Sequence, residues 1–185
     1  CLCDSGNYYM RSDWGENANF LHFHCGTLGA GHGHSDKLHI DLYANGEDIL
    51  VDGGRYTYVP GDQRYLFKDP SAHNTIIVDQ QDFTICKDSW ECSKLSQPMN
   101  QKFVVDEKYH FAQGGHLGYY DLESGSVFIN RKVIYIKPDI YVIVDEFYTD
   151  SKHQYNQFFH FNNEGVLSCD EIVTYKSDKN YVEMV

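Results

Sequence analysis

The sequence predicts an all-β protein: an antiparallel two-sheet β-sandwich that takes up residues 1–185 as a single domain. Three observations support this prediction. The chain is rich in Tyr (15 residues) and Phe (11 residues), which together with Val and Ile favour strands over helices. Short runs of alternating polar and apolar residues recur along it, separated by Gly, Asn and Asp. No long stretch repeats apolar residues at helical spacing.

The expected strands follow one another between turn residues. They cover residues 7–12, 18–26, 37–44, 48–52, 73–79, 101–113, 126–137, 140–149, 153–162 and 170–176, with a further strand at 181–185. Asn45-Gly46 predicts a tight hairpin, and Pro138-Asp139 predicts a second turn between neighbouring strands. Residues 60–70 and 80–99 lack alternation and are expected to form long loops with a short helical turn, which in a compact domain are often functional.

Composition excludes some functions. The net charge of -12 argues against a nucleic-acid binder, which needs a basic face. An acidic substrate remains compatible with this charge if local cations or a metal hold it. No apolar run approaches the roughly 20 residues of a membrane span. The six cysteines fit either disulfides in an exported protein or buried free thiols.

Both ends of the chain read as parts of a longer protein. The start, Cys1-Leu2-Cys3-Asp4, does not resemble a signal peptide, and Tyr181 to Val185 reads as a strand without a closing turn. Missing targeting information is therefore compatible with truncation. We expect a periplasmic, secreted or cell-surface location in a bacterium, with a cytoplasmic location not excluded.

Ten histidines form several groups of interest. Alternation places His22 and His24 on one strand face, where hydrogen bonding or solvent contact is a simpler expectation than metal chelation. His32 and His34 differ because glycines surround them, and glycine permits close approach of a ligand. His116, in a Gly-flanked segment, is expected in a surface turn.

Two further residues lie where strands leave or enter the core. Asp52 follows the apolar run 49–51, and His73 precedes the run 75–78. Two His and one Asp are a typical zinc ligand set whose fourth position is open to water or substrate. From the local pattern alone, however, an ordinary turn is the favoured explanation of Asp52.

Two other metal-enzyme motifs fail on the sequence. His32-x-His34-x-Asp36 is similar to the start of the metallo-β-lactamase motif, but Lys37 stands where that motif needs another His. The His-x-His of amidohydrolases needs a βα-barrel, which the strand pattern excludes. A cupin-like metal oxygenase needs a Glu and a later His in a different order.

Three segments, taken together, resemble the heparinase II/III-like family of polysaccharide lyases. They are Gly31-His32-Gly33-His34-Ser35-Asp36, the run from Leu50 through Asp52 to Tyr58, and Ala72-His73-Asn74-Thr75. Flanking stretches around Tyr8 to Trp14 and from Arg131 to Glu146 match as well. The resemblance spans about residues 5 to 162.

This resemblance implies a supersandwich-like β-domain preceded by an α/α toroid, with an active site between the two. It implies that His34, Asp52 and His73 bind zinc. Because such a site would lie deep under the loops, we favour a structural over a catalytic role for the metal. It also implies that His32 faces the substrate and that Tyr56 or Tyr58 lines the cleft. Members cleave acidic polysaccharides such as heparan sulfate, heparin or alginate by β-elimination.

The toroid usually supplies the Tyr acid/base and the residue that neutralises the substrate carboxylate. The chain alone is therefore expected to bind metal and saccharide with little turnover. Its expected partners are an acidic polysaccharide and the toroid domain of the same protein. With 15 basic residues, a weakly sulfated or unsulfated polyuronate is the favoured sugar. The alternative is a non-catalytic carbohydrate-binding or structural metal-bound β-domain.

Overall fold

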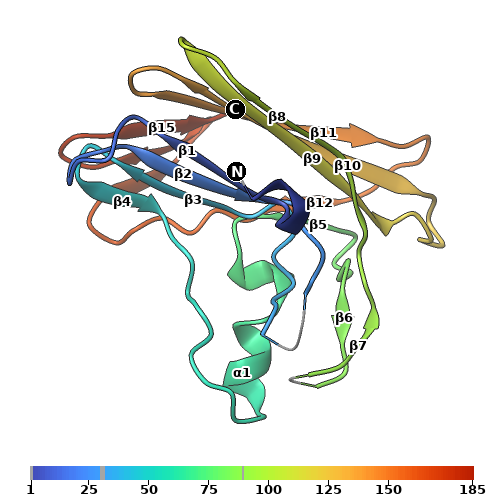
Figure 1. The fold of residues 1–185 in the computed structure, drawn as a ribbon. Coiled ribbons are helices and arrows are strands. Elements are labelled where there is room, and N and C mark those ends of the chain that lie inside the picture. Colours follow the sequence, from blue (N-terminus) through green and yellow to red (C-terminus); the bar gives the residue numbers. More distant parts are fainter. Residues whose placement is uncertain (1, 30–31, 89) are drawn as a thin grey trace.

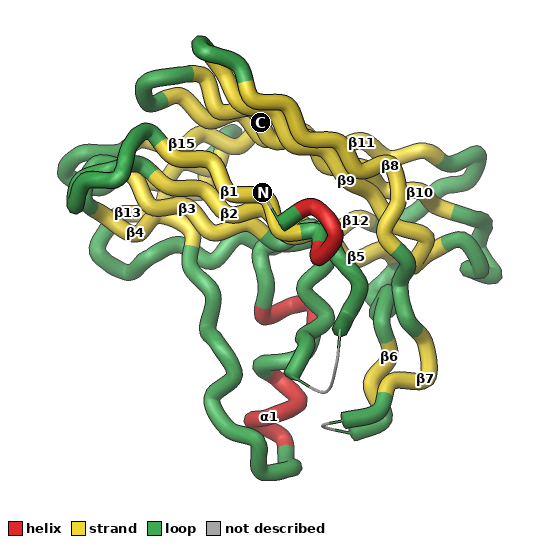
Figure 2. Tube along the Cα trace, in the orientation of Figure 1, coloured by secondary structure: helices red, strands yellow, loops and turns green. Residues whose placement is uncertain are grey.

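Two stacked antiparallel sheets form the body of the protein (Figures 1 and 2). The computed structural model describes residues 2–29, 32–88 and 90–185. One four-stranded sheet has the order β1-β2-β3-β4, and the other has the order β11-β10-β9-β8. The predicted all-β, two-sheet sandwich is confirmed.

The first sheet is a simple meander. Its strands are β1 (Asn7–Arg11), β2 (Phe20–His24), β3 (Ile40–Ala44) and β4 (Glu47–Leu50). Asn45 and Gly46 join β3 to β4 with φ of 56° and 84°, the two positive angles that a tight hairpin turn requires. This hairpin was predicted from the Asn-Gly pair. In β2, Leu21 and Phe23 are buried while their neighbours face outward, as the alternation predicted.

The second sheet consists of β8 (Pro98–Val105), β9 (Tyr109–Tyr119), β10 (Val127–Ile136) and β11 (Ile140–Tyr148). The single strand expected at 101–113 was wrong, because the chain reverses at residues 106–108 and forms two strands. Asp106 closes this turn, since its carboxylate accepts the Lys108 N–H at 2.9 Å and its own N–H donates to Tyr109 O. The turn contains neither Gly nor Pro, so the sequence pattern did not reveal it.

The segment around His116 belongs to β9 and not to a surface turn, so that expectation was also wrong. His116 is fully buried. The glycines before it allow close packing: a Cβ on Gly114 would lie 2.5 Å from the Cys25 sulfur, and one on Gly115 would meet the Phe128 ring at 2.6 Å.

The core lies between the facing sheets. Tyr8, Met10, Leu21, Phe23 and Ile40 from the first sheet share one buried cluster with residues of β9 and β10, namely Ala112, Ile129, Val133 and Tyr135. Their removal from water is the main stabilising contribution to such a fold.

Arg131 of β10 is a buried polar tie within this core. Its guanidinium forms a bidentate pair with Asp145 of β11, with distances of 2.6 Å from Nε and 2.8 Å from Nη2. The remaining Nη1 donates to Leu38 O at 2.7 Å and to Asn74 O at 2.6 Å. One side chain therefore connects the second sheet to the segments that enter β3 and β5.

The smaller elements extend this body. They are β5 (Ile76–Val78) paired with β12 (Tyr155–Gln157), the sheet β13 (Val166–Cys169), β14 (Val173–Lys176) and β15 (Tyr181–Met184), the hairpin β6 (Ile85–Cys86) and β7 (Cys92–Lys94), the helix α1 (Asp62–Leu66), and the 3-10 turns η1 (Cys3–Ser5) and η2 (Pro70–Ala72). The loops carrying α1 and the β6–β7 hairpin extend from the same side of the sandwich (Figure 1). No helix in the described ranges is long and apolar enough to cross a membrane.

Candidate metal centre and cleft wall

Asp52 and His73 lie near the ends of β4 and β5, and the segment that follows β12 runs beside both of these strands. Asp52 follows β4 after one residue, and His73 ends η2 just before β5. The stretch after β12 runs beside both strands, and within it His160 O accepts the Val51 N–H at 2.9 Å. This pairing brings together two side chains that are 21 residues apart in the chain.

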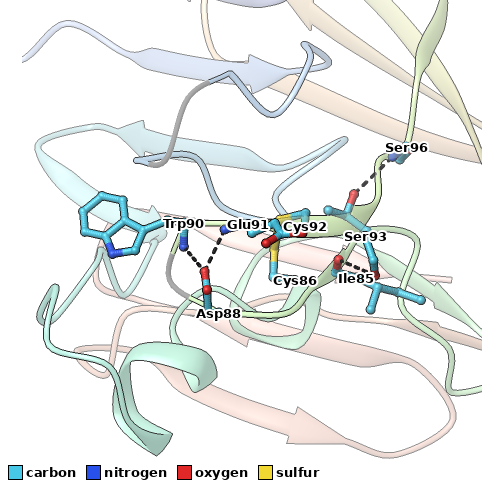
Figure 3. Close-up of a disulfide and its surroundings, with 9 residues drawn as sticks. Ile85, Cys86, Asp88, Trp90, Glu91, Cys92, Ser93 and Ser96 are labelled. Carbon is cyan, nitrogen blue, oxygen red and sulfur yellow. Dashed lines mark hydrogen bonds between the residues drawn. A yellow bond between two sulfur atoms is a disulfide. The ribbon is translucent and has the colours of Figure 1, made fainter.

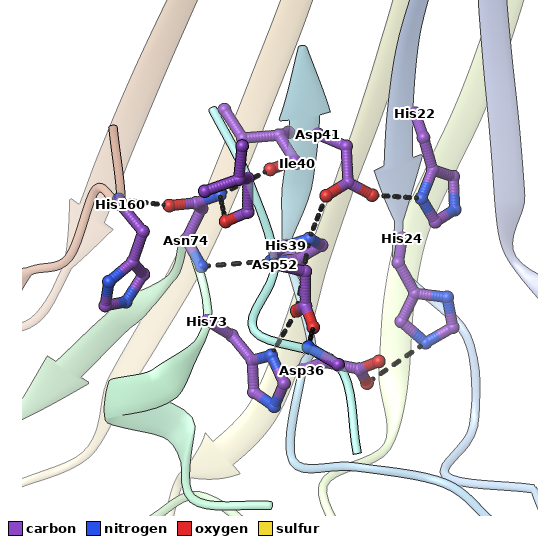
Figure 4. Close-up of polar contacts among 12 residues, drawn as sticks. His22, His24, Asp36, His39, Ile40, Asp41, Asp52, His73, Asn74 and His160 are labelled. Atoms are coloured by element: carbon purple, nitrogen blue, oxygen red, sulfur yellow. Dashed lines mark hydrogen bonds and ion pairs between the residues drawn. The ribbon is translucent and has the colours of Figure 1, made fainter. Parts of the chain in front are cut away.

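The closest contact of the centre joins these two residues. His73 Nδ1 lies 2.7 Å from Asp52 Oδ2 (Figure 4). Burial alone would raise the pKa of Asp52, but the His73 hydrogen bond and the charges of His73 and His39 lower it below its usual value. His73 is 1% exposed, and its Nε2 is buried without a hydrogen-bond partner. Such an orphaned imidazole nitrogen, on a ring oriented by a carboxylate, is an arrangement typical of metal-binding histidines.

His39 completes a cluster that the sequence analysis missed. One ligand atom each from His39, Asp52 and His73 lies within 4.8 Å of the others. His39 Nδ1 accepts the Asn74 N–H at 2.9 Å, so a neutral His39 carries its proton on Nε2, which lies 2.9 Å from Asp41 and 3.6 Å from Asp52. In this state His39 orients carboxylates and does not offer a lone pair to a metal. The sequence did contain a signal for His39, because its alternation with Asp41 places both side chains on the polar face of the same strand.

His34 lies beside the pair but has a different hydrogen-bond partner. Its ring centroid is 5.4 Å from that of His73, and its Nε2 accepts a hydrogen bond from Arg64 at 3.1 Å. Burial, with smaller contributions from His73 and Arg64, lowers the pKa of His34 to about 4. The ring is therefore neutral near pH 7, which is the form that binds metal. Coordination through Nε2 requires Arg64 to give up its hydrogen bond.

Asn74 holds the strands around the centre together. Its side-chain nitrogen donates to Ile40 O at 2.7 Å and to Val51 O at 3.1 Å, while its side-chain oxygen accepts the His160 N–H at 2.6 Å. With the N–H that donates to His39, Asn74 fixes three strand ends and one imidazole. The sequence reasoning gave Asn74 no role of its own.

His32 and Tyr58 form a second group next to the metal centre. The Tyr58 hydroxyl lies 2.7 Å from His32 Nδ1, and the two rings meet edge to face at 5.1 Å. Tyr56, predicted with them, is 68% exposed and stacks on Phe67 at 5.5 Å. Gly31, the first residue of the predicted motif, lies outside the described residues.

His22 and His24 are hydrogen-bonded on the outer face of β2, as expected. His22 lies 2.8 Å from Asn7 Oδ1 and 3.1 Å from Asp41, and His24 lies 3.1 Å from the same Asn7 oxygen. Through Asp41 this row continues to His39 and the metal centre (Figure 4). The polar face of the first sheet thus leads into the candidate site.

Comparison with known proteins identifies the family of this chain. The model of the heparinase II/III-like C-terminal family matches residues 2–183. The chain belongs to this family. The heparinase-like domain is 23% identical over 176 residues to the heparin-sulfate lyase of Bacteroides stercoris, covering 92% of this chain and 24% of the relative. It is 26% identical over 165 residues to an alginate lyase of Stenotrophomonas maltophilia, covering 82% of this chain and 22% of the relative.

Solved structures agree on the fold. The heparan sulfate lyase HepC of Pedobacter heparinus superposes with a TM-score of 0.80 at 17% identity, over 99% of this chain and 28% of that one. The domain therefore spans about a quarter of the length of the relatives it matches.

Proposed function

We propose that this heparinase-like domain is the metal-bearing β-sheet wall of a polysaccharide lyase that cleaves uronate-containing chains by β-elimination. The observation that carries the proposal is the contact between His73 and Asp52 beside the neutral ring of His34. The Nε2 atom of His73 is buried there without a hydrogen-bond partner. Its relatives include lyases of heparin-sulfate and alginate, which are both acidic polysaccharides.

In this proposal His34, Asp52 and His73 hold zinc, and the hydrogen bond between His73 and Asp52 would be given up when both side chains coordinate the ion. The donor set of two imidazoles and one carboxylate suits that ion. When bound, the metal braces the wall by linking the loop of His34 to the ends of β4 and β5. His39 and Asn74 orient the ligands, since both are buried and hydrogen-bonded to the surrounding segments.

The reaction needs three further contributions. A base removes the C5 proton of the uronate, the C4–O bond breaks as a C4–C5 double bond forms, and an acid protonates the leaving oxygen. A donor must also neutralise the carboxylate next to C5. His32 and Tyr58 lie on the wall that faces the sugar and can hold or donate a proton through their 2.7 Å contact. The remaining groups belong to the partner α/α toroid of the same protein.

A disulfide between Cys86 and Cys92 supports an export route for this protein. Such bonds persist in oxidising compartments and are rare in the cytosol. We therefore include a periplasmic, secreted or cell-surface location in the proposal.

Metal analysis of the purified chain tests the centre. We expect bound zinc that is lost in His34→Ala, Asp52→Ala and His73→Ala but kept in the matched control His22→Ala, on the same polar face. A chelator should lower the melting temperature of the wild type and leave the three ligand variants unchanged. Full zinc content in Asp52→Ala and His73→Ala would refute the site.

Absorbance of the new C4–C5 double bond tests the reaction. In a full-length enzyme that joins the toroid to this domain, we expect His32→Ala and Tyr58→Phe to reduce turnover while zinc content stays unchanged. A full-length protein that binds polyuronate without any absorbance increase would instead identify a carbohydrate-binding domain. The chain alone should bind with little turnover.

A further inference from the structure

The β6–β7 hairpin is a small projection that a disulfide closes. Its strands contain two and three residues, and their register is interrupted between Ile85 and Cys86. Ile85 is 46% exposed, so the hairpin buries little apolar surface of its own. A hairpin this short is not stable in water by itself. The bond between Cys86 and Cys92, six residues apart, supplies the missing constraint (Figure 3).

Hydrogen bonds inside the loop fix the backbone at its tip. Asp88 Oδ1 accepts the N–H of Trp90 at 2.6 Å and that of Glu91 at 2.8 Å (Figure 3). Lys87 N donates to Glu91 O at 2.8 Å, and the two side chains form an ion pair at 2.6 Å. The disulfide and these contacts together fix the position of the Trp90 backbone.

Trp90 reaches from this loop to the cleft wall. Its indole ring stacks on Tyr58 with a centroid distance of 5.9 Å and an interplanar angle of 22°, and it meets the edge of His32 at 6.0 Å. The residue is nevertheless 57% exposed. A large ring that rests on two cleft residues and still presents most of its surface to water contributes little to the core. Its exposed face is therefore open to a ligand.

Positive charge lies next to these rings. The Arg55 guanidinium is 4.2 Å from the centre of the Tyr58 ring, and that of Arg64 is 5.3 Å from it. Arg64 is buried and hydrogen-bonded to His34, so Arg55, which is exposed, is the cation that a ligand can reach. In a chain with a net charge of -12, such an exposed cation favours an anionic ligand. The C–H face of a pyranose ring packs on the electron-rich face of an aromatic ring. A uronate offers such a face together with a carboxylate.

We propose that Trp90, supported from behind by Tyr58, forms a stacking subsite for one uronate ring of the polysaccharide, and that the Cys86–Cys92 disulfide holds this subsite in place. The inference rests on the proposed function, because it places the ring next to His32 on the same wall. It adds a binding residue from a hairpin that neither the metal centre nor the proton-handling pair uses.

Intrinsic fluorescence provides a direct test, because the chain has two tryptophans. A Trp14→Phe variant, which removes an 89% exposed side chain, leaves Trp90 as the single reporter. We expect a saturable change in its emission on titration with a uronate tetrasaccharide prepared from alginate, and none with a neutral cello-tetraose. No saturable change with the uronate would overturn the subsite.

Variants then test the roles of the ring and of the disulfide, with affinity measured by calorimetry. Trp90→Ala should weaken binding of the tetrasaccharide by roughly fivefold, as for loss of one stacking contact, and Trp90→Phe should keep most of it. The double variant Cys86→Ser/Cys92→Ser should weaken binding by a similar factor. Cys169→Ser, at an exposed free cysteine, is the control and should bind as the wild type does.

The outcomes separate this inference from the proposed function. Unchanged affinity in Trp90→Ala would overturn the stacking role, and unchanged affinity in the double serine variant would overturn the role of the disulfide. Neither result touches the metal centre, which zinc content reports independently. We expect all four variants to keep wild-type zinc content, because the hairpin contributes no ligand.

Discussion

Replacing Arg131 by Met tests whether this buried side chain stabilises the fold by pairing with Asp145 of β11 and by linking the second sheet to Leu38 and Asn74. Met preserves the apolar part of the side chain and removes four hydrogen bonds: two to Asp145 and one each to the carbonyls of Leu38 and Asn74. Arg131 is fully buried and the Asp145 side chain is 3% exposed, so the change leaves a carboxylate without its counter-ion.

The expected cost follows from these contacts. Breaking a buried ion pair by removing one partner costs about 3–5 kcal/mol, because the other charge remains desolvated. Each carbonyl that loses its donor adds roughly 1 kcal/mol. The free energy of unfolding should therefore fall by about 5 to 7 kcal/mol, which approaches the whole stability of a typical domain.

Urea unfolding followed by fluorescence measures this loss. The matched control is Lys132→Met at the next position, since the Lys132–Glu146 pair is also 2.6 Å long but open to solvent, and its urea midpoint should barely move. The double variant Arg131→Met/Asp145→Leu should recover much of the stability, because no unpaired charge remains. The reasoning would be refuted if Arg131→Met were as stable as Lys132→Met. It would also be refuted if Arg131→Met/Asp145→Leu gained no stability over Arg131→Met.

Three further predictions concern the core and one turn. Burial lowers the pKa of His116 to about 3, below its value in the unfolded chain. The neutral, buried His116 therefore contributes to stability above pH 6.5, and this contribution is lost as the pH falls towards 3. Thermal unfolding of His116→Phe should show a shallower pH dependence in that window. Gly114→Ala should lower the free energy of unfolding by roughly 1–3 kcal/mol, because the new methyl group would meet Cys25 at 2.5 Å. In the same denaturation assay the control Gly15→Ala should lower it less, because its methyl group meets only a flexible Asp side chain. Gly46→Val should destabilise the β3–β4 hairpin, since φ is 84° there, and a lower melting temperature would register this.

Strand alternation and turn chemistry predicted most of the fold because both are local. The two faces of β2 and the Asn45-Gly46 hairpin follow from side-chain periodicity and from the need for positive φ. The turn at 106–108 was not predicted because an Asp carboxylate closes it without Gly or Pro. The glycines of β9 were read as a turn because sequence spacing does not reveal which residues pack against them: Cys25 against Gly114, Phe128 against Gly115 and Phe83 against Gly118.

The candidate site shows the same division between local and long-range information. Asp52 and His73 were chosen as ligands from the family resemblance, because the local pattern alone favours an ordinary turn for Asp52, and the structure places them 2.7 Å apart. Arg64 as the partner of His34 could not be foreseen, since α1 reaches that ring only through the folding of a long loop. His39 could have been found from alternation, but its contact with Asp52 depends on how β3 and β4 pair.

The hydrogen bonds of Asn74 also bear on how quickly different parts of the site can move. Its amide groups join β3, β4 and the segment after β12, so they separate only when the strands do, and hydrogen exchange there should require global unfolding. The loop of residues 54–59 instead makes local bonds, such as that from Thr57 N to Arg55 O, so we expect its amides to exchange faster. Asp52 and His73 should then stay fixed when Tyr56 and Tyr58 move, which would let a bulky polymer enter and leave without disturbing them.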